Sequence, residues 1–123
     1  MRYLLTLTVL VLIGLGSVKA APIDLPGKYL CAGTQGVDRY TVKLEIEAYD
    51  QTYIVKWVDE RGNPVLAGLG INERGNLAVS ILAPNGALGT AIYRLSPGEL
   101  DGIWTRGDGK RDMELCRKGD KAA

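Results

Sequence analysis

Two cysteines, Cys31 and Cys116, lie near opposite ends of the chain and constrain its fold more than any other feature. Between and around them, turn-forming residues recur at seven evenly spaced places. These turn signals are Gln35-Gly36, Asp50-Gln51, Arg61-Gly62-Asn63-Pro64, Arg74-Gly75-Asn76, Pro84-Asn85-Gly86, Pro97-Gly98 and Gly107-Asp108-Gly109. Seven turns separate eight segments, so the sequence predicts eight strands, the first and last of which carry the cysteines. The tetrapeptide Glu-Arg-Gly-Asn occurs at 60–63 and again at 73–76, which predicts the same hairpin turn at both ends of one strand.

The hydrophobic period supports strands rather than helices. Apolar and polar residues alternate without a break from Tyr40 to Glu47, and less cleanly from Tyr53 to Val58. Shorter runs of strand-forming residues follow at 77–82, 91–95, 100–105 and 113–116, and no stretch has the longer period of a helix. Because short connections force neighbouring strands to pair antiparallel, the sequence predicts an all-β up-and-down meander.

The cysteines test whether this meander closes. In an open sheet of this size, at about 4.8 Å per strand, the outer strands lie tens of ångströms apart. A disulfide needs α-carbons within about 7 Å of each other, which only a closed barrel or a folded-over sandwich provides. We therefore predict an eight-stranded antiparallel up-and-down β-barrel closed by a disulfide between Cys31 and Cys116. The alternative is a pair of free or metal-binding thiols. The chain has no histidine, however, so a tetrahedral zinc site is disfavoured, and we predict neither a metal nor a cofactor.

The amino terminus has the features of a secretory signal. Arg2 precedes an apolar run from Leu4 to Leu15, and Val18-Lys19-Ala20 offers small residues for cleavage after residue 20. A membrane anchor is the alternative, but the run is short against the roughly 20 residues of a spanning helix. We expect residues 1–20 to be a signal peptide and residues 21–123 to form one barrel domain, secreted or periplasmic, with no stable membrane anchor.

The charge pattern excludes some partners. The 15 basic and 14 acidic residues nearly balance and are interleaved along the chain. A nucleic acid or an anionic lipid surface would require a basic stripe, so we expect neither as a partner.

Several spaced segments together resemble a family of small secreted bacterial proteins. They are Gly27-Lys28-Tyr29 after Leu25-Pro26, Tyr53-Ile54-Val55-Lys56-Trp57, Gly68-Leu69-Gly70-Ile71, Ala91-Ile92-Tyr93-Arg94 and Leu100-Asp101-Gly102-Ile103-Trp104. That family is similar to the lipocalin and avidin type of calycin-like barrel, and some members carry the label fibronectin-binding protein. The chain departs from lipocalins at Tyr29, where their Gly-x-Trp motif has tryptophan. The resemblance implies a binding module, with no ligand residue carried over.

Residues for catalysis are sparse. Without histidine, a serine or cysteine nucleophile has no imidazole base. Glu45 and Glu47 fall on the polar face of their strand, and Asp59-Glu60 lies at a turn, so we interpret these carboxylates as solvated. Glu114 shares the phase of Cys116 and is expected to point inward, although the opposite phase stays open. We expect no enzyme activity; an enzyme that uses Glu114 is the least favoured hypothesis.

The aromatic residues suggest what the barrel holds. The chain has no phenylalanine, so each aromatic ring carries a polar group. An eight-stranded barrel is just wide enough to be filled by side chains or to admit one small ligand, and the small residues Gly89, Ala91 and Gly102 fit both. An inward Glu114 needs a hydrogen-bond partner such as Tyr29, Tyr40 or an arginine, and acts either as a polar plug or as a ligand anchor. We predict a secreted non-catalytic module for a small apolar or aromatic ligand or a protein partner, with a ligand site at Tyr40, Tyr53, Trp57, Tyr93, Trp104 and Glu114.

Two surface features suggest partners. Apolar residues occupy the outward phase of the middle strands and predict either a homodimer interface, as in avidin-like barrels, or scattered exposure: Ile54, Val58, Leu66, Leu82, Leu88 and Ile92. The integrin-type tripeptide Arg106-Gly107-Asp108 falls on the last predicted turn. It forms a candidate adhesion loop, so the alternative function is an extracellular adhesion protein that binds host matrix such as fibronectin.

Overall fold

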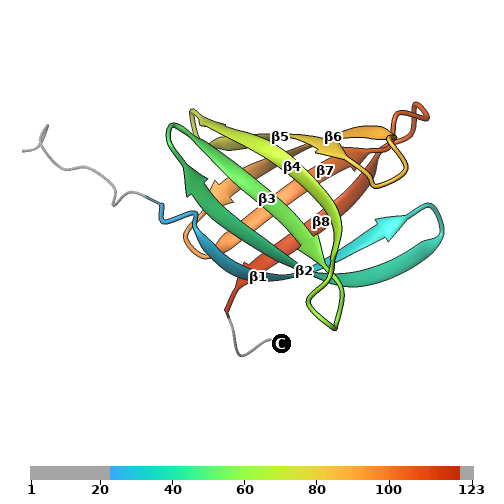
Figure 1. Ribbon diagram of the computed structural model, residues 1–123, viewed down its shortest axis with the longest axis horizontal. Helices are drawn as coiled ribbons and strands as arrows, with labels where there is room; N and C mark the ends of the chain where they lie inside the picture. Colours follow the sequence, from blue (N-terminus) through green and yellow to red (C-terminus); the bar gives the residue numbers. More distant parts are fainter. Residues whose placement is uncertain (1–22, 120–123) are drawn as a thin grey trace, which may run out of the picture.

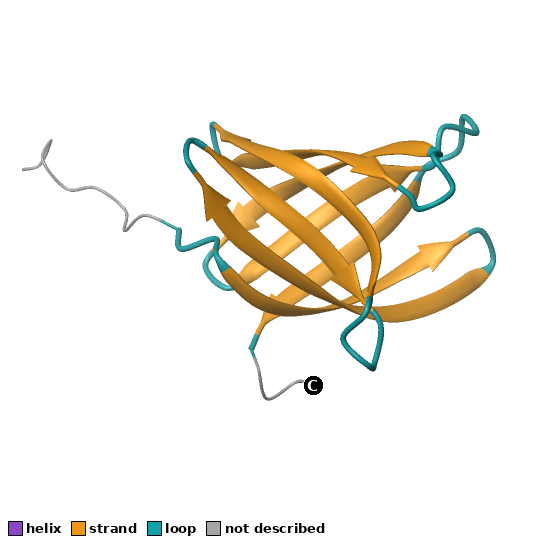
Figure 2. Ribbon diagram, in the orientation of Figure 1, coloured by secondary structure: helices purple, strands orange, loops and turns teal. Residues whose placement is uncertain are grey.

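The computed structural model describes residues 23–119, and within them every regular element is a β-strand (Figures 1 and 2). The predicted signal segment lies outside the described residues. Eight strands follow one another in the order β1 (Gly27–Gln35), β2 (Asp38–Tyr49), β3 (Thr52–Val58), β4 (Pro64–Glu73), β5 (Asn76–Leu82), β6 (Leu88–Ser96), β7 (Glu99–Thr105) and β8 (Asp112–Lys118). No helix within residues 23–119 is long and apolar enough to cross a membrane.

Each strand pairs antiparallel with its neighbours in sequence, and β1 also pairs with β8, which closes the barrel. Cys31 lies directly opposite Cys116 in the β1–β8 ladder, and a disulfide with an S–S distance of 2.03 Å joins them. The predicted closed barrel and its disulfide are therefore confirmed. The disulfide is also consistent with an oxidising compartment.

The predicted repeat of one turn type is wrong. Arg74 and Gly75 both have positive φ, 52° and 80°, and join β4 to β5 in a two-residue hairpin. The first copy of the tetrapeptide, at 60–63, instead belongs to a longer loop, in which the Asp59 carboxylate accepts hydrogen bonds from the backbone N–H groups of Arg61 and Asn63. Identical residues thus form different turns according to the side chain that precedes them.

The two ends of the barrel differ. At the end where the described chain begins, on the left of Figure 1, Leu25 is fully buried and accepts a 2.7 Å hydrogen bond from the Tyr29 hydroxyl. Lys118 lies over the Tyr29 ring at 5.8 Å and donates to the backbone oxygen of Asp24 at 2.6 Å. The segment before β1 thus plugs this end. The opposite end carries the β1–β2, β5–β6 and β7–β8 connections.

The core fills the plugged end and the middle of the barrel. Successive residues of each strand point alternately inward and outward, so the apolar residues of one phase converge on the axis. The buried cluster includes Leu44, Val55, Leu77, Val79 and Leu100. The open end is packed differently, and the candidate site lies there.

Candidate functional site

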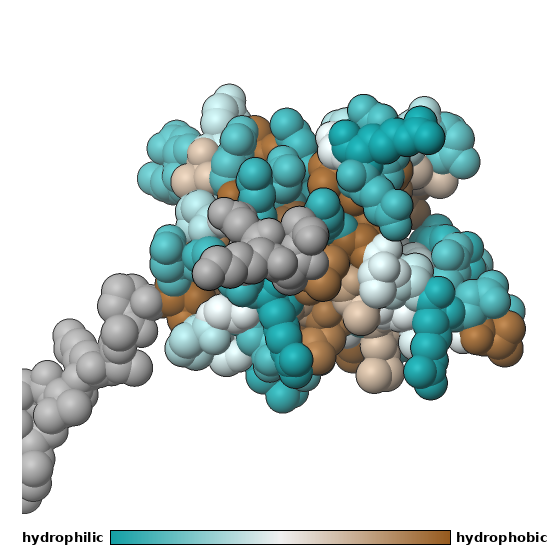
Figure 3. Space-filling model, turned by 90° about the horizontal axis from the view of Figure 1, so that it is seen from below, coloured by the Kyte–Doolittle hydropathy of each residue, from teal (hydrophilic) through white to brown (hydrophobic). Residues whose placement is uncertain are grey.

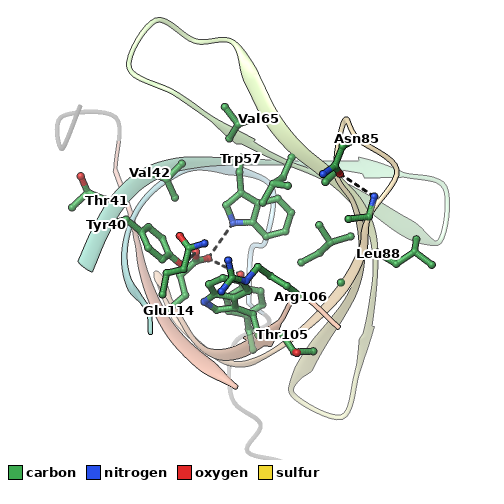
Figure 4. A pocket seen from close by; sticks show the side chains of 18 residues that line it. Tyr40, Thr41, Val42, Trp57, Val65, Asn85, Leu88, Thr105, Arg106 and Glu114 are labelled. Carbon is green, nitrogen blue, oxygen red and sulfur yellow. Dashed lines mark hydrogen bonds between the residues drawn. The ribbon is translucent and has the colours of Figure 1, made fainter. Parts of the chain in front are cut away.

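A cavity of about 440 Å³ opens at the end of the barrel opposite the plug (Figure 4). Its floor contains three buried side chains, those of Trp57, Tyr93 and Glu114. The remaining lining residues are Gln35, Tyr40, Thr41, Val42, Val65, Leu66, Ile81, Ala83, Asn85, Ala87, Leu88, Gly89, Trp104, Thr105 and Arg106. The barrel interior is therefore neither wholly solid nor wholly hollow, since a packed core and a cavity occupy opposite ends.

Glu114 is the buried acidic residue of the described barrel, and three neutral donors hold its carboxylate. Oε1 accepts hydrogen bonds from the Tyr93 hydroxyl at 2.6 Å and from the Trp57 indole N–H at 3.1 Å. Oε2 accepts one from the Tyr40 hydroxyl at 2.7 Å. The predicted inward phase and the predicted Tyr40 partner are therefore correct, whereas Tyr29 bonds elsewhere. Hydrogen bonds of this number stabilise a buried carboxylate.

Register explains how two tyrosines reach the same carboxylate. Tyr93 lies opposite Gly102, Gly102 opposite Glu114, Glu114 opposite Gly33, and Gly33 opposite Tyr40. We call these five residues the Glu114 row. The two glycines leave room for the rings: a β-carbon on Gly102 would meet Tyr93 Cε1 at 2.6 Å, and one on Gly33 would meet Tyr40 Cζ at 2.5 Å. Each tyrosine thus crosses a glycine to reach Glu114.

The environment of the row also affects the two phenols. Burial, and then the negative charge of Glu114, raise the pKa of the Tyr93 hydroxyl well above its usual value of 10.0. The same causes raise the pKa of Tyr40. Both tyrosines therefore remain protonated hydrogen-bond donors at neutral pH.

Trp104 forms one wall of the cavity, and its indole N–H, unlike that of Trp57, has no hydrogen-bond acceptor among the described residues. Its ring meets the Tyr40 ring edge-on, with centroids 6.2 Å apart and planes at 73°. Its indole N–H is buried and makes no hydrogen bond within residues 23–119, although it lies near enough to Tyr40 to lower that phenol's pKa in part. The Arg106 guanidinium carbon lies 5.9 Å from the Trp104 ring centroid.

Five of the six residues predicted for the ligand site line this cavity: Tyr40, Trp57, Tyr93, Trp104 and Glu114. The exception is Tyr53, which pairs with Ala48 near the β2–β3 turn and packs against the core. It has the inward phase but lies nearer the plugged end, so it does not line this cavity. The alternation of inward and outward residues along a strand does not show how far along the barrel axis a residue lies.

Sequence reasoning missed most of the residues at the mouth of the cavity. Val42 and Ile81 share the inward phase of predicted strands, so this signal was available. Asn85 and Ala87 lie in the β5–β6 connection, where no periodicity indicates direction. The structure adds Arg106 to the cavity lining, although the sequence assigned it to an adhesion loop.

The Arg106-Gly107-Asp108 tripeptide lies in the β7–β8 connection, as predicted. Arg106 lies over Trp104, and its Nη2 atom is 3.8 Å from the Asp108 carboxylate. The carboxylate also accepts a hydrogen bond from the Lys110 backbone, and this bond is the main cause that lowers the pKa of Asp108. The two charges of the tripeptide are thus paired with each other.

The outer apolar surface differs from the predicted one. Leu66 faces the cavity and Val58 is only 3% exposed, so neither belongs to an exposed patch. Leu82, Leu88 and Ile92 are exposed as expected, and Ile54 is half-buried. A continuous row of cross-strand neighbours runs over β4 to β8, and we call it the outer apolar row: Ile71, Ala78, Ile92, Ile103 and Met113. Hydrophobic side chains also interrupt the hydrophilic ones on the face that Figure 3 shows.

A cluster of Cys31, Cys116 and Glu114 has the proximity of metal ligands, but the two sulfur atoms are joined in the disulfide and are not thiolates. Cys116 Sγ simply contacts Glu114 Oε1 at 3.4 Å.

Comparison of the chain with known protein families and with curated proteins finds no match.

Proposed function

We propose that the protein is a secreted or periplasmic, non-catalytic module that binds a small, largely apolar molecule in the open end of its barrel. The observation that carries this proposal is the cavity of about 440 Å³, lined by the aromatic rings of Tyr40, Trp57, Tyr93 and Trp104. Its size lies within the range of small-molecule sites, about 300–1,000 Å³. We propose further that the barrel is of the lipocalin or avidin type, as the sequence resemblance implies.

The arrangement around Glu114 supports binding rather than catalysis. The carboxylate is held by three donors, and two of them are phenols with raised pKa values, so neither phenol is poised to release a proton near neutral pH. A fixed polar group at the floor of an apolar cavity orients a ligand. Glu114 thus combines the two roles considered from the sequence, a plug and an anchor.

The two indoles provide the test, because Trp57 and Trp104 are the tryptophans of the chain and both line the cavity. Titration of the oxidised protein with a panel of small apolar and aromatic molecules is expected to change the tryptophan fluorescence saturably. Trp104→Leu should remove much of that change. A flat fluorescence and calorimetric response across the panel would exclude the proposal.

A second candidate function is contact with another protein, favoured by the outer apolar row. The row leaves Ile71 60% and Met113 64% exposed, and contiguous apolar surface of this kind is typical of interfaces. We therefore propose the outer apolar row, in place of the residues predicted from the sequence, as the interface of a homodimer. Sedimentation of the parent protein and of Ile92→Glu tests it: a dimer that becomes a monomer in the variant supports the interface, and a monomeric parent contradicts it.

The adhesion alternative is tested separately. Immobilised fibronectin should retain the purified domain at micromolar concentration if the protein binds matrix. Asp108→Ala should reduce that retention if the tripeptide is responsible. The pairing of Arg106 with Asp108 gives this alternative no added support.

A further inference from the structure

The cavity has two chemically different sides. Tyr40, Trp57, Trp104 and Glu114 come from β2, β3, β7 and β8 and give one side its aromatic rings and its carboxylate. The other side is aliphatic, with Leu66, Ile81 and Leu88 from β4, β5 and β6. Figure 4 shows Tyr40 and Glu114 on one side of the opening and Leu88 on the other. A molecule that fills this space needs a hydrocarbon part and a separate polar part.

The carboxylate determines which polar part fits. None of the ion pairs within residues 23–119 includes Glu114, so its partners are all neutral. A carboxylate offers about four acceptor positions, and three are taken, two on Oε1 and one on Oε2. The buried negative charge is thus hydrogen-bonded but not neutralised. In a site of low dielectric, a positive group gains strongly from such a charge.

The aromatic walls favour the same kind of group. The rings of Tyr40 and Trp104 meet at 73° and form a corner beside Glu114. Cations bind over the faces of such rings, and Arg106 already does so at 5.9 Å from the Trp104 centroid. Its side chain is 50% exposed and its ion pair with Asp108 is long, at 3.8 Å. The protein's own cation therefore occupies a position that an incoming cation would use.

We propose, on the basis of the binding function above, that the cavity takes an amphipathic organic cation, with its ammonium group between Glu114, Tyr40 and Trp104 and its hydrocarbon part against Leu66, Ile81 and Leu88. Arg106 competes with this ammonium group for the face of Trp104. Binding thus requires the Arg106 side chain to move off the ring, which an exposed arginine on a connection between strands does readily.

Three probes of equal chain length separate the charge preference from simple apolar binding. Octylammonium, octan-1-ol and octanoate are titrated into the oxidised protein at pH 7, below their aggregation limits, with calorimetry and tryptophan fluorescence as readouts. Octylammonium is expected to bind about tenfold or more tighter than octan-1-ol, the size of one charge-assisted hydrogen bond. Octanoate is expected to bind more weakly than either.

Two variants assign the effect to residues. Arg106→Ala removes the competing cation and should raise the affinity for octylammonium about threefold relative to the affinity for octan-1-ol. Arg111→Ala, an exposed arginine of the same β7–β8 connection outside the cavity lining, is the matched control and should change neither. Glu114→Gln, if circular dichroism shows that it folds, should bring octylammonium to within about threefold of octan-1-ol. Because Arg106→Ala alters only an exposed residue, the test does not depend on the folding of Glu114→Gln.

The outcomes distinguish this inference from the function on which it rests. Equal binding of the three probes retains the apolar site but overturns the cation preference. If octanoate binds most tightly and Arg106→Ala abolishes that binding, the cation preference is also overturned. The cavity is then assigned to an organic anion. Absence of binding by all three contradicts both proposals.

Discussion

At the scale of single residues, Glu114 is the clearest departure from an ordinary barrel core. A buried carboxylate is unfavourable unless its oxygens accept hydrogen bonds, and here Tyr40, Trp57 and Tyr93 supply them. The interaction is mutual, because the buried indole and phenol groups would otherwise be unpartnered. The side chains of this group therefore depend on one another.

Glu114→Leu tests this dependence. The leucine retains similar volume but leaves the Tyr93 hydroxyl and the Trp57 indole N–H without an acceptor. We expect a loss of about 3 kcal/mol in the free energy of unfolding, measured by denaturant titration with circular dichroism. Glu47→Leu, the same change at an exposed position of β2, is the control and should stay within about 0.5 kcal/mol of the parent. Equal losses in the two variants would mean that the hydrogen bonds of Glu114 add nothing specific.

Tyr29 gives the plugged end a dependence on alkaline pH. Burial, assisted by the charge of Asp24, raises the pKa of Tyr29 to about 12 from 10.0. The folded protein therefore retains the phenolic proton at pH values where the unfolded chain has lost it. This contribution to stability is fully present below pH 10 and is lost as the pH rises toward about 12.

The corresponding variant is Tyr29→Phe, which has no phenolic proton to lose. At pH 7 it should cost about 1 kcal/mol, because the hydrogen bond to the Leu25 backbone oxygen disappears. Above pH 10 its melting temperature should fall less steeply than that of the parent, and Tyr49→Phe supplies the comparison for an exposed tyrosine. A Tyr29→Phe slope that matches the parent's would show that this phenol does not govern the alkaline transition.

At the scale of strands, register converts spacing in sequence into the geometry of the site. Tyr93, Gly102 and Glu114 lie on the consecutive strands β6, β7 and β8, and the register places them side by side. The glycine is needed for the space beside it rather than for its backbone angles, because the Tyr93 ring lies over it. Cross-strand rings commonly cover glycines in this way.

Gly102→Ala is the test at this scale. The added methyl group would meet Tyr93 Cε1 at 2.6 Å, so the ring must move away from Glu114. We expect a loss of about 2 kcal/mol in the free energy of unfolding, together with altered affinity for cavity probes. Asp101→Ala, on the exposed face of the same strand, should affect neither. Unchanged stability in Gly102→Ala would mean that the tyrosine has room to shift.

The same scale shows what the sequence alone could predict. Turn signals and the period of two predicted the number, order and direction of the strands, because these properties depend on local residues. The position of Tyr53 outside the cavity and the different turns of the two Glu-Arg-Gly-Asn segments could not be predicted, because depth along the barrel and the length of a loop depend on partners elsewhere. Gly33 was not identified for a similar reason, since its role follows from the register that places it between Tyr40 and Glu114.

At the scale of the whole molecule, closure and the site are linked. The β1–β8 ladder that closes the barrel also contains the pair formed by Gly33 and Glu114, two residues from the pair formed by Cys31 and Cys116. The disulfide therefore fixes the register next to the carboxylate. Hydrogen bonding along the ladder closes the barrel independently, because Tyr29 to Gly33 are all in register with β8.

Removal of the disulfide separates these contributions. In Cys31→Ala/Cys116→Ala, the unfolded chain regains the freedom of a loop with a sequence separation of 85. The chain-entropy model gives a loss of about 4–5 kcal/mol in the free energy of unfolding. Because the β1–β8 ladder remains, we expect the variant to keep its β-sheet circular dichroism at low temperature and to melt in one step at a lower temperature. An unchanged melting temperature would show that the ladder alone sets stability, whereas loss of the β signal at low temperature would show that closure requires the covalent bond.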